Sequence, residues 1–386
     1  MAFSSLSVAE VVTTPASLAG IGYYLACLWA SRDYRRSAHP AETQFLPPVS
    51  ILKPLKGEDP EIYESFRSHC LQNYPKYELI FGVSDPHDPA VQAVKQLRSE
   101  FPQHSIQLIV CGESLGTNAK VSNLVQMART ASYDHFIVSD SDIRVSPDYL
   151  QRVMAPLANS KVGVVTCLYR GVTGQTFSSK LESLGISTDF LAGVLVARVL
   201  EGVHFALGST MAFRRDDLRA IGGFESIVDF LADDYELGKR IAGLGREVVI
   251  SEEIVDTFLP AYSFGQFFDH QLRWARGVRA ARPGGYLGLL FTFGWQWAFL
   301  TVLVSKGSSW SWGLLALAAS LRMLVAWNVG WRVLKDRQVL RLLPMLAIRD
   351  LIAPLIWMAS FASNNVTWRG DRFTVKRGKL VRTNSP

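Results

Sequence analysis

The segment His135-Phe136-Ile137-Val138-Ser139-Asp140-Ser141-Asp142 decides the fold of this chain. In it, an apolar run of strand length is followed at once by two aspartates one residue apart. Ligands of parallel sheets bind beyond the carboxyl ends of the strands, so Asp140 and Asp142 lie where a site is expected. Their hard oxygens suit Mg²⁺ or Mn²⁺, which would also bind a diphosphate. Aspartates are common in turns too, and the pair alone leaves both interpretations open.

Apolar runs and helical patterns alternate on both sides of this segment. The expected strands are Val49–Leu52, Glu78–Val83, Ile106–Val110, His135–Ser139, Val162–Cys167 and Glu247–Ile250. The expected helices are Pro60–Gln72, Pro89–Glu100, Ala119–Ala131, Pro147–Ala158, Phe177–Val199 and Asp234–Ala242. This alternation indicates an α/β fold with a mainly parallel sheet. The chain has no G-x-G-x-x-G and no G-x-x-x-x-G-K-[ST], which disfavours a dinucleotide enzyme and a P-loop NTPase.

The composition indicates a membrane protein. The 386 residues are 48% hydrophobic and 19% charged, whereas soluble domains carry about 25% charged residues. A wholly soluble enzyme, a disordered chain and a disulfide scaffold are therefore disfavoured. The stretch from Val11 to Ala30 has no charge and is long enough to span a bilayer. Because Arg32, Arg35 and Arg36 follow it, the N-terminus is expected outside and the following chain in the cytoplasm.

Further apolar stretches lie near the C-terminus. Tyr286–Ser305 is uncharged, and Trp310–Trp331 is interrupted by Arg322; the short link between them predicts a hairpin. Leu342–Ala362 contains the charged residues Arg349 and Asp350 and the prolines Pro344 and Pro354. These favour a re-entrant or interfacial segment over a third crossing helix, which would put the basic C-terminus outside. Arg322 either faces a lipid or phosphate path or pairs with Asp350.

The excess positive charge is concentrated at the C-terminal end. The chain has 40 basic and 34 acidic residues, a formal net charge of +6. Residues 369–382 include six of the basic residues and one acid, Asp371. A basic tail beside apolar segments suggests anionic lipid headgroups before nucleic acid. The four cysteines lack metal-site spacing and are expected to be reduced structural thiols.

Three other segments carry residues suited to catalysis or binding. Asp233-Asp234 opens an expected helix, where acids either interact with the helix dipole or supply a general base. Lys120 begins a helix whose N-terminus suits phosphate, although it also fits an ordinary surface lysine. Arg273-Trp274 lies on an amphipathic helix that suits a membrane interface, or binds a diphosphate and packs against an acceptor.

Taken in order, Asp85 at the end of the second strand, the pair Asp140 and Asp142, Asp233-Asp234 and Arg273-Trp274 form a set. The set resembles the D, D, D, (Q/R)xxRW series of family 2-like glycosyltransferases. The closest likeness is to the ceramide glucosyltransferase family, glycosyltransferase family 21. That family implies a GT-A nucleotide-sugar-binding fold, a UDP-sugar donor, a membrane lipid acceptor and a cytoplasmic active site.

The resemblance also implies a role for each matched residue. Four residues would bind the UDP-sugar, namely Asp85, Lys120, Asp140 and Arg273. Asp140 and Asp142 would hold Mg²⁺ or Mn²⁺. Asp234 matches the catalytic base of the family, and Asp233 lies beside it.

The last motif departs from the family pattern. Its first residue is His270 rather than Gln or Arg, ahead of Arg273 and Trp274. This arrangement is similar to that of a hopanoid-associated glycosyltransferase that uses UDP-N-acetylglucosamine. The expected reaction is transfer of glucose from UDP-glucose to ceramide, giving glucosylceramide, with hopanoid N-acetylglucosaminyl transfer as the alternative. An alternative of a different class is a non-catalytic membrane-binding module. A processive polysaccharide synthase is disfavoured, because it usually needs more membrane helices to form a channel for the polymer.

The expected organisation has five parts. These are an N-terminal anchor (1–36), a cytoplasmic GT-A catalytic domain (37–263), an interfacial amphipathic segment (264–285), a C-terminal membrane region (286–364) and a basic tail (365–386). The expected location is the inner membrane of a bacterium, or the Golgi or endoplasmic reticulum of a eukaryote. No nucleic-acid partner is expected.

Overall fold

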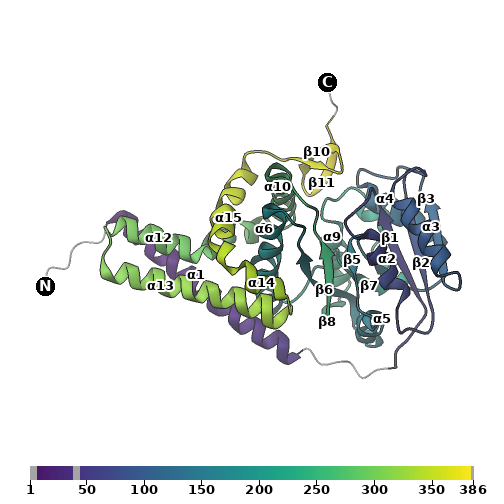
Figure 1. Ribbon diagram of the computed structural model, residues 1–386, viewed down its shortest axis with the longest axis horizontal. Helices are drawn as coiled ribbons and strands as arrows, with labels where there is room; N and C mark the ends of the chain where they lie inside the picture. The colour runs from purple at the N-terminus through teal and green to yellow at the C-terminus, as the bar shows by residue number, and fades with distance from the viewer. Residues whose placement is uncertain (1–6, 38–43, 384–386) are drawn as a thin grey trace.

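The computed structural model describes residues 7–37 and 44–383. The outer ends of the expected anchor and tail, and the junction after the anchor, lie outside the described residues. An α/β domain occupies one end of the long axis, and a bundle of apolar helices occupies the other (Figure 1).

An eight-stranded sheet forms the centre of the α/β domain, in the order β3-β2-β1-β4-β7-β6-β8-β5. Its strands are β1 (Val49–Leu55), β2 (Tyr77–Val83), β3 (Ser105–Val110), β4 (His135–Val138), β5 (Ile143–Arg144), β6 (Val162–Val172), β7 (Met211–Arg214) and β8 (Glu247–Phe258). The first four strands of this order run parallel, β7 is antiparallel to both neighbours, and β6 and β8 are parallel. The expected mainly parallel sheet is confirmed, with β5 and β7 as additional strands.

Helices cover both faces of the sheet. They are α2 (Ile62–Cys70), α3 (Ala90–Glu100), α4 (Ala119–Thr130), α5 (Tyr149–Met154), α8 (Arg215–Ala220) and α9 (Asp233–Gly243). Side chains alternate along a strand, so neighbouring residues enter different cores. Leu79 and Phe81 pack in one hydrophobic cluster, and Ile80 packs in another. The apolar runs of the sequence therefore belong to strands that are buried on both faces.

The apolar bundle includes α1 (Val8–Ser37), α12 (Gly294–Val304) and α13 (Ser309–Ala326). Figure 1 shows these three helices side by side. A Cβ on Gly20 would lie 2.1 Å from the Cα of Gly294, so α1 and α12 approach as closely as glycines allow. Helices long and apolar enough to cross a membrane are Val8–Ser37, Phe177–Leu200 and Ser309–Val333.

Two expected apolar segments differ from the structure, one in the C-terminal membrane region and one in the expected α/β domain. The stretch Tyr286–Ser305 is not one straight helix, because α11 (Pro283–Gly288) with the short turn after it is bent by 52° against α12. Glycines in and before this stretch weaken helical continuity. The helix expected over Phe177–Val199 is divided by a π-helical turn, Ile186–Phe190, into α6 (Phe177–Gly185) and α7 (Leu191–Leu200). It packs against α1 through an apolar cluster that includes Tyr24 and Leu191.

The remaining helices are α10 (Phe264–Ala281), α14 (Arg337–Leu342) and α15 (Leu346–Phe361). With 16 residues, α15 is about 24 Å long, which is less than the roughly 30 Å of hydrocarbon in a bilayer. Its length favours the expected re-entrant or interfacial segment.

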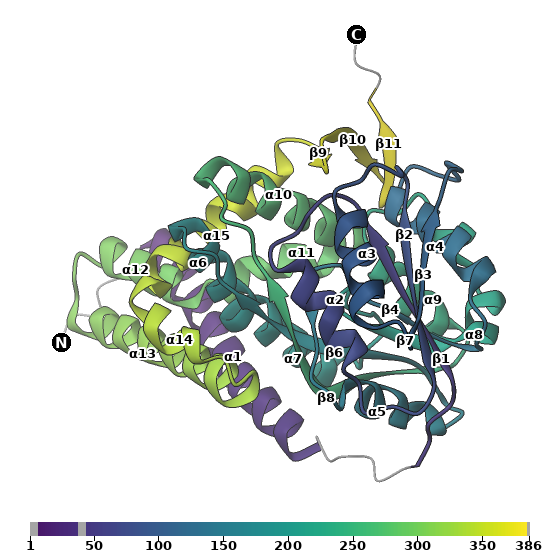
Figure 2. The same cartoon turned by 45° about the vertical axis from the view of Figure 1, so that its right-hand side comes forward.

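The C-terminal residues are folded rather than an extended tail. They form a three-stranded antiparallel sheet of β9 (Asn365–Trp368), β10 (Asp371–Lys376) and β11 (Lys379–Arg382). Figure 2 shows this sheet against the α/β domain, near the start of α4. Its apolar side chains, with Phe373 and Val375 alternating along β10, pack against Leu231. This alternation was overlooked because the segment was interpreted only by its net charge.

The pairing of Arg322 with Asp350 is confirmed. The guanidinium donates from Nε and Nη2 to the two carboxylate oxygens at 2.8 and 2.7 Å. Both side chains are 7% exposed, and Arg322 also donates to the carbonyl of Thr188. The pair therefore joins α13 and α15 to the π-helical turn.

We predict that Arg322→Leu lowers the free energy of unfolding by about 3–5 kcal/mol, because it leaves a buried carboxylate without its partner. The double variant Arg322→Leu/Asp350→Asn removes both charges and keeps an oxygen that can accept from Trp295, which bonds Asp350 in the parent. It should regain most of that loss in denaturant unfolding in detergent micelles. A double variant as unstable as the single variant would contradict this prediction.

Candidate active site

The acidic site forms where β4 ends. The strand stops at Val138, and the turn with Asp140 and Asp142 leads directly into β5, which pairs with the end of β8. The carboxyl ends of the parallel strands β1 and β4 are neighbours at this edge. The sheet therefore brings the two aspartates to the edge predicted from the sequence.

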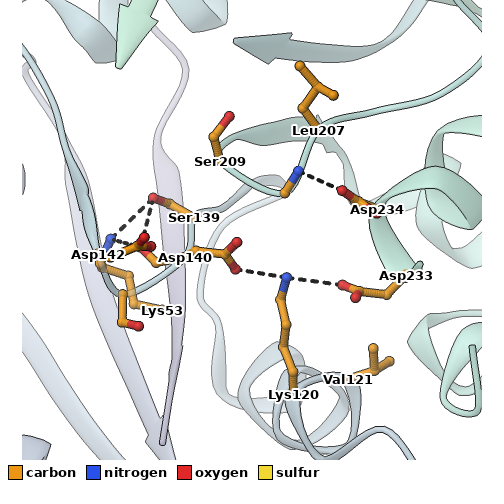
Figure 3. Close-up of polar contacts among 12 residues, drawn as sticks. Lys53, Lys120, Val121, Ser139, Asp140, Asp142, Leu207, Ser209, Asp233 and Asp234 are labelled. Carbon is orange, nitrogen blue, oxygen red and sulfur yellow. Dashed lines mark hydrogen bonds and ion pairs between the residues drawn. The ribbon is translucent and has the colours of Figure 1, made fainter. Parts of the chain in front are cut away.

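Lys120 joins the two acidic segments. Its ammonium lies 2.8 Å from Asp140 Oδ1 and 3.2 Å from Asp233 Oδ2 (Figure 3). The Lys120 side chain is only 16% exposed. Burial opposes the charge, but the carboxylates of Asp140, Asp233 and Asp234 raise its pKa above the usual lysine value. Lys120 is thus charged and held between carboxylates, and not an isolated surface lysine.

Asn118 fixes the position of Lys120. Its side chain caps α4 by accepting from the Val121 amide at 3.2 Å, an arrangement that satisfies a free helix donor. The same side chain donates to the carbonyl of Phe230 at 2.8 Å. This second bond ties the start of α4 to the segment that leads into α9, and so sets the lysine opposite Asp233.

A second lysine lies beneath the Asp140 turn. Lys53 on β1 is fully buried and donates to Ser139 Oγ at 3.1 Å and to the Asp140 carbonyl at 2.9 Å. Burial lowers its pKa to about 7, although Asp142 and Asp140 act in the opposite direction. The sequence analysis missed Lys53, because a lysine in a strand gives no signal that its ammonium is buried.

Asp142 lies in the turn between β4 and β5, beside Asp140. Burial and the neighbouring Asp140 raise its pKa to about 6. Its carboxylate accepts a hydrogen bond from Thr257 on β8. In the described part of the chain, no group of three or more His, Cys, Asp or Glu forms a complete metal shell. Two adjacent hard carboxylates suit Mg²⁺ or Mn²⁺ when a diphosphate and water supply the remaining oxygens.

Asp234 points to the same place from α9. Its carboxylate accepts from the amides of Gly208 at 2.8 Å and Tyr235 at 2.7 Å. Burial and Asp233 raise its pKa to about 6, while Lys120 opposes the rise. A Cβ on Gly208 would lie 3.0 Å from Asp140 and 3.3 Å from Asp234. Gly208, which the sequence analysis missed, therefore lets the two aspartates approach one another.

The last motif lies on α10. His270 Nδ1 is 2.8 Å from the buried carboxylate of Glu182 on α6, and its ring stacks on Tyr262 with centroids 5.6 Å apart. Trp274 packs against His270 and Phe190, with centroids 5.1 and 5.8 Å away. The sequence analysis missed Glu182, because a single acid in an apolar helix gives no indication of its distant partner.

Arg273 on α10 lies near the acidic site without an ion pair to any other residue that the structure describes. Its guanidinium lies over the ring of Trp368, 5.7 Å from the centroid. Burial lowers its pKa, and the nearby Tyr262 and Glu182 act in the opposite direction. A partly exposed guanidinium without an ion pair among the described residues suits an anionic ligand at this position.

Asp85 is not brought into the acidic cluster. It is exposed in the turn after β2 and accepts from the His87 amide at 2.8 Å. No hydrogen bond or ion pair among residues 7–37 and 44–383 joins it to Asp140, Asp142 or Asp234. Its nucleotide-binding role stays a prediction.

Comparisons with known proteins point to one family. A family model described as glycosyl transferase family 21 matches residues 12–381. Ceramide glucosyltransferase 3 of Caenorhabditis elegans is 25% identical, and the match covers 96% of this chain and 83% of the relative. Ceramide glucosyltransferase 1 of the same organism is also 25% identical, over 88% of this chain and 74% of the relative. The ceramide glucosyltransferase of Candida albicans is 31% identical, over 28% of this chain and 22% of the relative.

A solved structure shares the fold. It is a mannosyltransferase from Pyrobaculum calidifontis in complex with GDP-mannose and Mn²⁺. The TM-score is 0.55 at 20% identity, covering 92% of this chain and 98% of the other. The likeness confirms the arrangement of the α/β domain and its flanking helices.

We predict that Lys120→Met destabilises the fold by about 1–3 kcal/mol at pH 8, because buried acceptors lose their charged donor. The neighbouring carboxylates then repel, so their pKa values in the folded state rise above the value of about 4 in the unfolded chain. The folded variant binds more protons, and its stability falls as the pH rises through this range. Thermal unfolding followed by tryptophan fluorescence should show a smaller deficit at pH 5 than at pH 8.

The matched control is Lys95→Met, at an exposed position of α3. It should leave stability unchanged at both pH values. Equal deficits of Lys120→Met at the two pH values would refute the electrostatic role.

Proposed function

The chain belongs to glycosyltransferase family 21, and from this we propose that it transfers a sugar from a UDP-sugar to the hydroxyl of a membrane lipid. The donor and acceptor we propose are UDP-glucose and ceramide, as the names of the relatives suggest. The observation that carries the proposal is the cluster of Asp140, Asp233 and Asp234 around Lys120, at the carboxyl ends of a GT-A-like sheet.

The proposed chemistry is a single displacement. The acceptor hydroxyl attacks the anomeric carbon while UDP leaves from the opposite face, so the configuration inverts. Asp234 takes the hydroxyl proton as general base. With a pKa of about 6, it is a stronger base than a solvent-exposed aspartate and is still ionised at neutral pH. Its hydrogen bonds to Gly208 and Tyr235 hold the carboxylate in place.

The leaving diphosphate needs positive charge. Asp140 and Asp142 would hold Mg²⁺ or Mn²⁺, which supplies Lewis-acid stabilisation of the diphosphate when bound. Arg273, partly exposed and without an acidic partner among the described residues, donates to the phosphate oxygens. Lys120 holds Asp140 and Asp233 close together. No general acid is needed, because UDP leaves as an anion.

The apolar helices suit a lipid acceptor. Helices α1 and α13 are candidates to cross the membrane, and α10 carries Arg273 and Trp274 beside the aromatic side chain of Phe190. An amphiphile resting at headgroup depth would present its hydroxyl at this position. We propose an integral membrane protein with a cytoplasmic catalytic domain, in the bacterial inner membrane or in the Golgi or endoplasmic reticulum of a eukaryote.

The purified protein, incubated with a panel of UDP-sugars and lipids and read by mass spectrometry, tests this function. The expected product is glucosylceramide. Transfer of N-acetylglucosamine to a hopanoid would instead support the hopanoid N-acetylglucosaminyltransferase that His270 suggests. Absence of transfer from every donor, with intact lipid binding, would support the non-catalytic membrane-binding module.

We predict that Asp234→Asn lowers lipid glycosylation by about 10²–10⁴-fold, the usual contribution of a general base. Asparagine keeps an oxygen that can accept from the Gly208 amide, so UDP-sugar binding should change little. Asp233→Asn should lose much less, since Asp233 contacts Lys120 rather than that amide. Steady-state kinetics and calorimetric donor binding on both variants separate the two roles.

The pH profile gives a further check on the same residue. Protonated Asp234 cannot accept a proton, so kcat/KM of the parent should fall as the pH drops below about 6. Equal losses for the two variants, or loss of donor binding in Asp234→Asn, would show that the assigned roles are wrong.

We predict that Asp142→Ala abolishes turnover while stability changes far less, because the carboxylate serves the bound cation. Activity should require Mg²⁺ or Mn²⁺ and disappear in excess chelator. Asp216→Ala is the matched control, since that aspartate is 88% exposed on α8, and it should keep full activity. An Asp142→Ala variant that is fully active in chelator excludes the metal site.

A further inference from the structure

The C-terminal sheet carries an arginine to the edge of the acidic site. β9 and β10 are joined by Arg369 and Gly370, which have φ values of 50° and 88°. Two positive φ values are the signature of a two-residue hairpin turn in which Asn or Gly is usual at the first position. An arginine there adopts a backbone that is costly for its side chain. Because a strained backbone is often found at functional sites, the contacts of the guanidinium are important.

Arg369 holds Asp59 with both arms of its guanidinium. Nη1 donates to Oδ1 at 3.1 Å and Nη2 to Oδ2 at 3.2 Å. Asp59 also accepts from the hydroxyl of Ser141, which is the residue between Asp140 and Asp142. The guanidinium is therefore separated from the two candidate metal ligands by one carboxylate and one residue of the turn.

The charges around Arg369 agree with this position. Burial disfavours its charge, yet Asp59, Asp142 and Asp140 together raise its pKa above the usual arginine value. The Arg369 side chain is still 41% exposed, whereas Asp59 is 12% exposed. The guanidinium is thus accessible to a ligand that enters the acidic site, and its present partner is the more deeply buried group.

The sheet that carries Arg369 is firmly attached. The Leu380 amide donates to the Asp229 carbonyl at 2.7 Å, and the Leu231 amide donates to the Gly378 carbonyl at 3.0 Å. Thr117 Oγ1 donates to the Leu380 carbonyl at 2.9 Å. These contacts lie just before α9 and α4, the helices that carry Asp233, Asp234 and Lys120. The hairpin turn is consequently held at a fixed place relative to the catalytic groups.

We propose that Arg369 is a diphosphate-binding residue of the donor site, and this rests on the proposed function as a nucleotide-sugar transferase. When a nucleotide diphosphate and its metal ion enter beside Asp140 and Asp142, phosphate oxygens replace Asp59 as the bidentate partner of the guanidinium. Carboxylate and phosphate can both accept two hydrogen bonds from arginine, so the guanidinium keeps two bonds after the exchange, and Asp59 keeps the one from Ser141. Arg273, over the Trp368 ring of the same hairpin, supplies a second guanidinium.

The competing explanation is that the ion pair of Arg369 with Asp59 is a clasp, that is, a contact that only holds the hairpin in place. The two explanations predict opposite effects of Asp59→Asn. If the pair is only a clasp, removing either partner loosens the hairpin, and donor binding weakens to a similar extent in both variants. If Arg369 binds the diphosphate, Asp59→Asn frees the guanidinium from its competitor, and donor binding is unchanged or tighter.

The experiment measures the dissociation constant of UDP in the presence of Mn²⁺ by isothermal titration calorimetry, with the full chain in detergent micelles. Arg369→Met should weaken binding by roughly 10-fold to 100-fold, as expected for loss of hydrogen bonds to a charged group. Arg369→Lys should recover only part of this, because an ammonium cannot bind in the bidentate mode. UMP, which lacks the second phosphate, should be affected much less than UDP.

Arg377→Met is the matched control. Arg377 lies in the other hairpin turn of the same sheet, with φ of 50° and a following glycine at 81°, and is exposed. It should leave UDP affinity at the parental value. Thermal unfolding of each variant reports any loosening of the hairpin separately from ligand binding.

The outcomes are distinct. Unchanged UDP affinity in Arg369→Met, or equal weakening in Arg369→Met and Asp59→Asn, overturns the proposal in favour of a clasp. If the parent binds GDP with Mn²⁺ and not UDP, the proposed donor is wrong while Arg369 is still tested with GDP. A parent that binds neither diphosphate refutes both the donor site and the role of Arg369.

Discussion

The position of Lys120 between Asp140 and Asp233 is the interaction on which the rest of the site depends. Asp140, Asp142, Asp233 and Asp234 converge in a partly buried place, where like charges repel more strongly than in water. The ammonium of Lys120, in direct contact with two of them, and that of Lys53, beneath the Asp140 turn, offset this repulsion. Burial, together with the repulsion that remains, raises the pKa values of Asp142 and Asp234. That repulsion is the property that a metal ion and a general base require.

Local sequence patterns were sufficient for the sheet and for part of the site. An apolar run followed by Asp140 and Asp142 places the pair at a strand end whatever the distant contacts are. Lys120 was singled out because it begins an expected helix, and Asp234 because it matches the motif of the family. Three residues were missed because their contacts are with residues far away in the chain, namely Glu182, Gly208 and Lys53. For example, Gly208 matters because Asp140 and Asp234 approach it from two different elements.

In the apolar helices, too, local sequence predicted some features, and others depend on contacts with distant residues. Hydropathy located the apolar segments near both ends of the chain, and the high cost of isolated charges in such an environment made the pairing of Arg322 with Asp350 one of two alternatives. The bend before α12 and the π-helical turn after α6 did not follow from hydropathy. They depend on backbone hydrogen bonding and on close approach, as between Gly20 and Gly294. Composition therefore predicts that these segments are apolar, but the contacts between helices determine whether each helix is straight.

The attachment of the C-terminal sheet has a consequence for synthesis of the protein. The bond between Thr117 and Leu380 closes a loop of 263 residues, and the ion pair of Lys56 with Asp371 closes one of 315. The apolar helices from α6 to α15 lie within both loops, and α1 precedes them. A ribosome delivers residues 365–382 only after all of these helices have been made, so the contacts of the sheet form after the helices can enter the bilayer. The C-terminal sheet is therefore the last part of the described chain to be made.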